Sequence, residues 1–305
     1  MSESTDLCKH LDPKLRSTAL DLAKVFHRAG GNLLLVGGSV RDLLMGLSPS
    51  ELDFEARGLS VDQIKSTLSP KYRCDEVGKA FGVLKIKQSP IEIALPRTEV
   101  KTGTGHKGFT IHPDPNLPYE QAVQRRDFTI NAVGLDLLEG TLLDPLNGKT
   151  DIQKRILCHI GPAFKEDPLR VLRGMQFIAR FQLKPTQKTI EVCKSMDTED
   201  LAPERIYEEW KTLMLKGINL SDGLNFLKNT GWLKHFPELS ALINCQQEPE
   251  WHPEGDVWVH TLHCMDAFAQ ERVGNDWEDL VVGFAVLCHD MGKPLTTRID
   301  KNGRI

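Results

Sequence analysis

The sequence predicts an α+β head with a mixed sheet, followed by an all-α body. In roughly the first half, segments with helical periodicity alternate with short apolar segments typical of strands. From Asp167 onward the periodicity is almost entirely helical. A chain of 305 residues is long enough for about two domains with their own cores. We expect residues 1–161 to form the head, 162–248 a helical neck and body, and 249–305 a separate C-terminal part.

The elements of the head can be placed in order along the chain. Apolar residues at helical spacing over Leu15–Ala29 stop at Gly30-Gly31, which is typical of a helix terminus. The other predicted helices cover Val40–Met45 and Val61–Leu68, and the predicted strands cover Asn32–Val36, Leu52–Ala56, Gly82–Lys87, Ile91–Leu95, Phe128–Leu135 and Thr141–Leu143. Gly, Pro and Asp are concentrated over Thr102–Pro118, which predicts a long mobile loop. The helices of the body are expected to break at Pro185, Pro203, Gly231, Pro237 and Pro249–Pro253.

The composition excludes several classes of protein. Hydrophobic residues make up 40% of the chain and charged residues 26%, which is ordinary for a globular protein and excludes a disordered or collagen-like chain. No stretch reaches the roughly 18–20 apolar residues that a membrane span needs, and the first residues lack the apolar core of a signal peptide. The seven cysteines are scattered, with no CxxC pair, which favours reduced thiols. We therefore expect a cytoplasmic protein with no membrane partner.

The net charge of −4 conceals a gradient along the chain. Residues 151–195 carry nine Lys and Arg against four Asp and Glu, whereas residues 246–290 carry one Arg against ten acids. A mildly acidic protein can therefore present a basic face in its middle to a polyanion. A solvated helical face explains the same run of charges, so charge alone does not establish nucleic-acid binding.

The segment GGSVRD, Gly37–Asp42, has the pattern of a phosphate-binding turn. A strand that runs into Gly37-Gly38 lets the backbone approach a ligand closely, because neither residue has a Cβ. The helix that follows presents backbone N–H groups at its N-terminus, and Arg41 could add a charge-assisted fork to phosphate oxygens. An ordinary structural turn is the alternative interpretation.

An acidic strand follows this turn. In an extended strand residues i and i+2 share a face, so Asp53 and Glu55 are expected to project together. Paired carboxylates with substrate phosphates are the ligands that Mg²⁺ prefers, and such a site serves nucleotidyl transfer. Glu51 lies on the same face, so the sequence does not decide which two of the three acids bind metal. An exposed acidic edge strand is the alternative.

With these segments the chain resembles the class II nucleotidyltransferases, which include the CCA-adding tRNA nucleotidyltransferases and the bacterial poly(A) polymerases. GGSVRD and the acidic strand are followed by RRDFTINA at Arg125–Ala132, which is similar to that family's motif of the same spelling. KEDPLRVLR, at Lys165–Arg173, is similar to the family's EDxxR helix. The motifs follow in the family's order from about Leu33 to Phe181.

The resemblance implies a role for each motif. Two Mg²⁺ ions would be held by Asp53 and Glu55. The nucleotide would be bound by Gly37, Gly38, Arg41, Arg126, Asp167, Arg170 and Arg173. Asp167, an expected N-cap before Pro168 at the first helical position, would read the base of CTP or ATP together with Arg170. Gln176 departs from the pattern, because the family often has an Arg at that position, and this leaves one triphosphate contact in doubt.

The loop after the acidic strand favours CCA addition within the family. The segment from Pro96 to Thr110 resembles the flexible loop of CCA-adding enzymes, with Gly103, Gly105 and Gly108 making it pliant. The resemblance therefore implies an enzyme that adds C, C and A to tRNA lacking its 3′ CCA, using CTP and ATP. A CC-adding, A-adding or poly(A)-synthesising relative remains open, as does an ordinary surface loop.

The C-terminal part resembles an HD phosphohydrolase domain. The segments Trp251–Thr261 and Leu287–Lys293 contain His260, His289 and Asp290, which match that domain's metal ligands and could hold a divalent transition metal. The domain's last Asp ligand is expected downstream of Ile305, so we expect a partial, hydrolytically inactive HD domain in a truncated protein. Plain polar roles for these residues, a phosphohydrolase, and a non-catalytic RNA-binding fragment are the alternatives.

Overall fold

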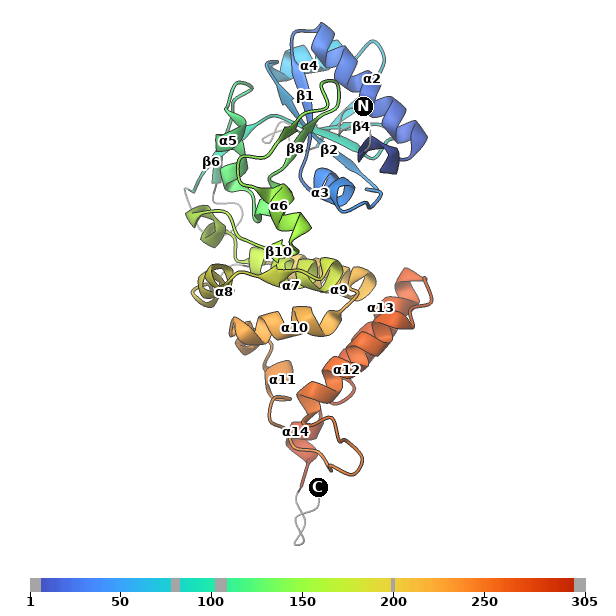
Figure 1. Ribbon diagram of the computed structural model, residues 1–305, viewed down its shortest axis with the longest axis vertical. Helices are drawn as coiled ribbons and strands as arrows, with labels where there is room; N and C mark the ends of the chain where they lie inside the picture. Colours follow the sequence, from blue (N-terminus) through green and yellow to red (C-terminus); the bar gives the residue numbers. More distant parts are fainter. Residues whose placement is uncertain (1–6, 78–82, 102–108, 199–200, 299–305) are drawn as a thin grey trace. The chain divides into compact units, whose positions relative to one another are not determined.

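A computed structural model describes residues 7–77, 83–101, 109–198 and 201–298 (Figure 1). The chain divides into two compact units, Met1–Glu166 and Asp167–Ile305. The first unit contains a mixed sheet with helices and the second is built from helices, so the predicted fold class is confirmed. The boundary between the two units, after Glu166, lies a few residues beyond the expected end of the head at 161. The division at 248 stays a prediction.

A seven-stranded sheet forms the frame of the first unit. Its order is β3-β4-β5-β2-β1-β8-β9, and only the pairing of β2 with β5 is parallel among the described strands. The strands are β1 (Asn32–Val36), β2 (Leu52–Arg57), β3 (Cys74–Val77), β4 (Val83–Ile86), β5 (Ile91–Ala94), β8 (Gly134–Asp136) and β9 (Leu142–Leu143). The predicted acidic strand, β2, therefore lies inside the sheet between β1 and β5 and is not an exposed edge.

Helices pack against this sheet through their apolar faces. They are α2 (Pro13–Arg28), α3 (Gly38–Leu44) and α4 (Val61–Leu68), with the short helices η1 (Cys8–His10), α5 (Tyr119–Ala122) and η2 (Val123–Arg125). The unit also contains the short helices α6 (Gly148–Gln153) and η4 (Pro162–Glu166). The side chain of Asp12 caps α2 by accepting from the backbone N–H of Lys14 and Leu15. Leu22 and Phe26 of α2 are fully buried, and such burial contributes about 1.5–3 kcal/mol per side chain.

Two expectations for the first unit were wrong in part. Phe128–Leu135 is not one strand, because η3 (Thr129–Asn131) interrupts it before β8. The carboxylate of Asp127 accepts hydrogen bonds at 2.8 Å from Phe128 N and from Asn131 Nδ2, and this local bonding replaces a strand ladder. The predicted loop also contains a strand, since β6 (Arg97–Lys101) pairs antiparallel with β7 (Phe109–Pro113). Gly103, Gly105 and Gly108 lie outside the described residues. Strand β10 (Ile156–Leu157) comes late in the unit.

The second unit consists of packed helices. They are α7 (Leu169–Phe181), α8 (Gln187–Lys194), α9 (Pro203–Lys216), α10 (Leu220–Asn229), η5 (Trp232–His235), α11 (Pro237–Ser240), α12 (Val257–Gln270), α13 (Asp276–Cys288) and α14 (Lys293–Thr296), with the short strand β11 (Lys184–Pro185). A Cβ at Gly223 of α10 would lie 2.7 Å from the carbonyl oxygen of Met175, so the missing side chain lets α10 approach α7. The breaks at proline and glycine fall where the sequence predicts them.

In the described part of the chain, no helix combines the length and the apolar character needed to cross a membrane.

Candidate functional site

The turn between β1 and α3 requires glycine at its first position. Gly37 has φ +70°, and a Cβ there would lie 2.9 Å from Nη1 of Arg126 and 4.0 Å from Oδ2 of Asp53. A side chain at Gly37 would therefore be strained and would also displace Arg126. This contact brings three predicted site residues, from separate motifs, to one place.

A hydrogen-bond network joins the segment RRDFTINA to GGSVRD. Arg41 donates from Nη1 to Oδ1 of Asn131 at 2.8 Å and from Nε and Nη2 to Oδ1 of Asp42. Arg126 donates to the backbone oxygen of Asn131 at 2.9 Å. Because Arg41 is only 6% exposed and its guanidinium is bonded to protein oxygens, it braces this network. Its direct contact with a triphosphate stays a prediction.

The carboxylate of Asp53 lies in an unusually negative setting. Burial, followed by the charges of Glu51 and Glu92, raises the pKa of Asp53 to about 6, and Arg126 opposes the rise. Glu92 is the register partner of Asp53 on the parallel strand β5. A cation placed among these acids would relieve their repulsion, so the residues fit a divalent metal.

The third acid of the strand, Glu55, is engaged elsewhere. It is 4% exposed, and its Oε1 lies 2.5 Å from Nη1 of Arg57, which also donates to the carbonyl oxygen of Leu117. Arg57 shares a strand face with Glu55 and neutralises it, whereas the charge of Glu51 acts on Asp53. Metal binding by the predicted pair Asp53 and Glu55 stays a prediction; in the structure Glu55 has an internal ion pair, and the charge of Glu51 acts on Asp53.

The hydroxyl of Ser39 fixes the backbone between the two acids. Its Oγ donates to the carbonyl oxygen of Glu51 and accepts from the N–H of Asp53, each at 3.1 Å, and the residue is 3% exposed. One buried hydroxyl therefore ties the start of β2 to α3 and sets the positions of both carboxylates.

The predicted nucleotide-selecting residues lie at the start of α7 in the second unit. The helix begins at Leu169, with Pro168 as the cap residue, one position later than expected. Asp167 still acts as a helix-start acceptor, because its Oδ1 accepts from Leu169 N at 3.2 Å. Its Oδ2 lies 2.8 Å from Nη2 of Arg205 on α9, which the sequence analysis did not single out.

Three further residues of α7 were singled out from the sequence: Arg170, Arg173 and Gln176. Arg170 and Arg173 lie three apart on α7, and Nη1 of Arg173 is 3.8 Å from Oε1 of Glu209. Gln176 is 3% exposed and accepts a hydrogen bond from Arg180 at 3.1 Å. Gln176 therefore belongs to the helix packing.

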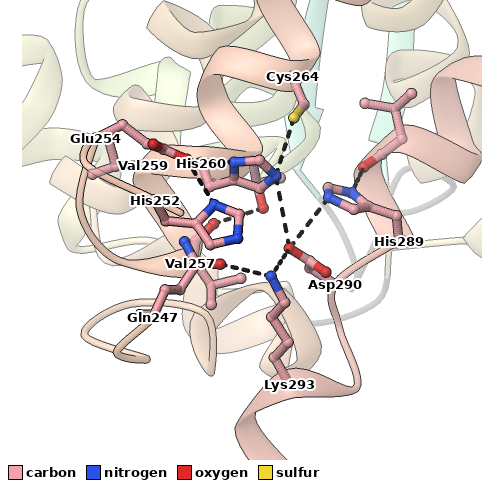
Figure 2. Close-up of polar contacts among 12 residues, drawn as sticks. Gln247, His252, Glu254, Val257, Val259, His260, Cys264, His289, Asp290 and Lys293 are labelled. Atoms are coloured by element: carbon pink, nitrogen blue, oxygen red, sulfur yellow. Dashed lines mark hydrogen bonds and ion pairs between the residues drawn. The ribbon is translucent and has the colours of Figure 1, made fainter. Parts of the chain in front are cut away.

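The HD-like residues gather in a polar cluster at the end of the second unit (Figure 2). Oδ2 of Asp290 lies 3.2 Å from Nε2 of His289, 3.9 Å from Nε2 of His260 and 2.7 Å from Nζ of Lys293. Cys264, one helical turn after His260, places its Sγ 3.4 Å from the same Nε2. The three predicted ligands are thus brought together, and Cys264 joins them.

The carboxylate of Glu254 orients two histidines of the cluster. Oε1 of Glu254 lies 3.0 Å from Nδ1 of His252 and 2.7 Å from Nδ1 of His260. A backbone hydrogen bond, followed by those from the two histidines, lowers the pKa of Glu254 to about 2. Glu254 is therefore an anion that accepts from both rings. Burial, with the charges of Asp290 and Glu254, raises the pKa of the Cys264 thiol.

Several site residues lacked a signal that sequence reasoning could use. Glu92 could have been found only by pairing its strand with β2, and Arg205 lies 38 residues from Asp167. Cys264 could have been noticed, because it stands four residues after His260 on a helix, the spacing that puts two ligands on one face.

Comparison with known proteins supports the motifs. Residues 33–158 match the family model described as the Poly A polymerase head domain. A Multifunctional CCA protein of Xanthomonas campestris is 40% identical over 272 residues, which are 87% of this chain and 64% of that protein. A Multifunctional CCA protein of Xylella fastidiosa is 38% identical over 278 residues, 87% of this chain and 63% of that protein. The chain thus spans less than two thirds of the length of these relatives.

Solved structures share the fold. The CCA-adding enzyme of Thermotoga maritima, complexed with tRNA, has a TM-score of 0.64 at 20% identity and covers 98% of this chain and 70% of its own. The Bacillus stearothermophilus CCA-adding enzyme in complex with CTP has a TM-score of 0.62 at 20% identity, over 93% of this chain and 79% of its own. The family match covers the strand, turn and acidic residues described above, so residues 33–158 of this chain are similar to the Poly A polymerase head domain.

Proposed function

We propose that this protein adds C, C and A to the 3′ end of tRNA that lacks them, using CTP and ATP. The observation that carries the proposal is the group of acids Glu51, Asp53 and Glu92, whose Asp53 lies beside Gly37 and Arg126. The similarity to two Multifunctional CCA proteins supports the choice of reaction, and the fold of CCA-adding enzymes agrees with it. All seven cysteines are free, which is consistent with a cytoplasmic location as part of the proposal.

Divalent metals are general in this family of nucleotidyltransferases, and we assign two Mg²⁺ to the head. Glu51 and Asp53 would hold them, with Glu92 beside Asp53. When bound, Mg²⁺ supplies charge neutralisation at the triphosphate and activation of the primer's 3′-hydroxyl. Ser39 holds the backbone of Glu51 and Asp53 in place. Arg126, which donates to the Asn131 carbonyl, adds a positive charge close to Asp53.

In the second unit, selection of the base rests on Asp167 and Arg170. A carboxylate accepts from an exocyclic amine, which cytosine and adenine both carry, and a guanidinium donates to ring or carbonyl acceptors. Arg205 orients the carboxylate of Asp167 through the 2.8 Å ion pair. Arg173 is assigned to the phosphates. The basic stretch 151–195 would contact the RNA backbone.

The test of the proposal is incorporation of labelled nucleotides into tRNA that lacks its last three residues, with Mg²⁺. We expect CTP alone to add two residues, CTP with ATP to add three, and addition then to stop. A ladder of A without use of CTP would assign poly(A) synthesis. Arrest after two C residues would assign a CC-adding enzyme, and ATP used only on tRNA that already ends in CC would assign an A-adding one. Salt-dependent tRNA binding without incorporation would assign an RNA-binding fragment.

Ser39→Ala is expected to impair the dependence of nucleotide incorporation on Mg²⁺ while the protein remains folded. Loss of two buried hydrogen bonds should lower the free energy of unfolding by about 1–2 kcal/mol. It should also raise the Mg²⁺ concentration needed for half-maximal incorporation, because Glu51 and Asp53 lose their common anchor. Ser66→Ala, at an exposed position of α4, is the matched control. An unchanged Mg²⁺ dependence would show that Ser39 is only structural.

Arg205→Ala is expected to lower the preference for CTP over UTP by roughly tenfold, because Asp167 loses its orienting partner. The measurement is the ratio of kcat/KM for the two nucleotides. Lys211→Ala, on the same helix and paired with exposed Glu208, is the control. A ratio equal to that of the control would contradict the role of Arg205.

We also assign a divalent transition metal to the HD-like residues His260, His289 and Asp290. The cluster supports this, because two imidazoles and a carboxylate face one point. Phosphohydrolase activity is the alternative function for this site, and it would be seen as metal-dependent phosphate release that is lost in His289→Ala while nucleotide addition continues.

A further inference from the structure

Two arginines lie against the glycine turn between β1 and α3, one at each glycine. A Cβ at Gly37 would lie 2.9 Å from Nη1 of Arg126, and a Cβ at Gly38 would lie 3.4 Å from Nη2 of Arg41. Both guanidinium groups therefore fill space that a side chain would need. Because a phosphate can approach this turn closely, the two arginines place charged donors at both of its residues.

One residue, Asn131, holds both guanidinium groups. Its side-chain Oδ1 accepts from Nη1 of Arg41 at 2.8 Å, and its backbone oxygen accepts from Nη1 of Arg126 at 2.9 Å. Its Nδ2 donates to Oδ1 of Asp127 at 2.8 Å, and because a carboxylate can only accept, this bond fixes which end of the amide faces Arg41. Asn131 is 5% exposed, so these bonds are shielded from competing water.

The turn that carries Asn131 is held in place by Tyr119, which no motif singles out. The hydroxyl of Tyr119 donates to the carbonyl oxygen of Ala132 at 3.1 Å, and the residue is 3% exposed. A Cβ at Gly134 would lie 2.7 Å from this hydroxyl oxygen, so the glycine leaves room for the phenol. Tyr119 begins α5, and Arg126 directly follows η2, so the bond joins the segment before Arg126 to the turn after it.

We propose that Asn131 is a positioning residue for triphosphate recognition, and that it acts through Arg41 and Arg126. The inference rests on the nucleotidyl transfer proposed above. Arginines whose positions are fixed before binding lose little conformational freedom when they bond phosphate oxygens, so they bind a triphosphate more tightly than mobile side chains do. Since the base is assigned to Asp167 and Arg170, Asn131 should contribute to the affinity for the phosphates and not for the base.

The experiment compares the affinities of the whole protein for CTP and CMP, measured by calorimetry with Mg²⁺ and without tRNA. The two ligands share the base and the ribose and differ in their phosphates, and we expect the wild type to prefer CTP. Asn131→Ala should weaken CTP binding at least about tenfold and CMP binding less than about twofold. Asn32→Ala, at the start of β1, loses a 2.9 Å hydrogen bond to the carboxylate of Asp136 and is the matched control that should keep both affinities.

Tyr119→Phe tests the same network without removing a side chain of the turn. It keeps the aromatic ring and deletes only the hydroxyl that bonds Ala132, so it also serves if Asn131→Ala is poorly folded. CTP binding should weaken about threefold, CMP binding should not change, and in tRNA extension the KM for CTP should rise more than kcat falls. Tyr72→Phe, which loses a hydroxyl bonded to Asp21, is the matched control.

The outcomes separate this inference from the proposed function. A wild type that binds CTP no more tightly than CMP would contradict the triphosphate site itself, and with it the inference. A wild type that prefers CTP, with Asn131→Ala and Tyr119→Phe keeping that preference, would overturn the inference alone. Equal loss of CTP and CMP affinity in the two variants would show that Asn131 is only structural and would also overturn it.

Discussion

Asp53→Asn is expected to abolish nucleotide addition and at the same time to stabilise the metal-free protein. The activity should fall at least about a thousandfold, because Asn cannot hold the metal charge that the transferring phosphate requires. Burial and the nearby acids place the pKa of Asp53 at about 6, above its ordinary value of 3.8. The folded protein therefore binds more protons than the unfolded chain between these values, and its stability falls as pH rises through that window.

The variant Asp53→Asn removes the loss of stability that ionisation of Asp53 causes. At pH 8 the metal-free Asp53→Asn protein should exceed the wild type in free energy of unfolding by roughly 2 kcal/mol, and the difference should shrink toward pH 4. Denaturant unfolding at the two pH values measures this, with chelator present. Mg²⁺ should stabilise the wild type and leave the variant unchanged. A variant that still extends tRNA, or that is less stable than the wild type at pH 8, would contradict the assignment of Asp53.

Glu51→Gln is expected to reduce activity and Glu55→Gln to reduce stability. Glu51→Gln should lower incorporation by at least about a hundredfold with little change in stability, since Glu51 is exposed and shares the metal with Asp53. Glu55→Gln should cost roughly 2–3 kcal/mol of stability, because Arg57 keeps a half-buried charge without its carboxylate. The fraction of Glu55→Gln that is folded should retain its activity.

These two variants are measured by denaturant unfolding and by initial rates of addition, each normalised to folded protein. Glu139→Gln, in the exposed turn before β9, serves as a control for loss of one negative charge. If Glu55→Gln is folded and inactive while Glu51→Gln is active, the pair predicted from the sequence would be right and our proposed pair wrong.

The fold was predictable where local signals agree. Val61–Leu68 has the predicted bounds because its periodicity is joined by a capping box at Ser60 and Gln63. Asn32–Val36 also has the predicted bounds, as a run of buried apolar residues. Phe128–Leu135 was misassigned because the bonds of Asp127 to Phe128 and Asn131 are made by side chains, and the hydrophobic pattern does not show them.

The residue types of the site were predictable from the sequence, but the ion pairs among them were predictable only in part. Alternation along a strand places Glu51, Asp53 and Glu55 on one face, and it also places Arg57 there. Which acid this arginine neutralises depends on side-chain geometry and on the carbonyl of Leu117, far away in the chain. The same holds for Arg205, whose partner Asp167 lies just before the start of another helix.

The most direct test of the central claim is the sequence of the 3′ ends that the wild type produces. The substrate is tRNA without its last three residues, with CTP, ATP and Mg²⁺ present together. The account predicts molecules that end in CCA and no longer products, and ends that stay unextended with Asp53→Asn. Runs of A, or extension that is equal in the wild type and in Asp53→Asn, would contradict it.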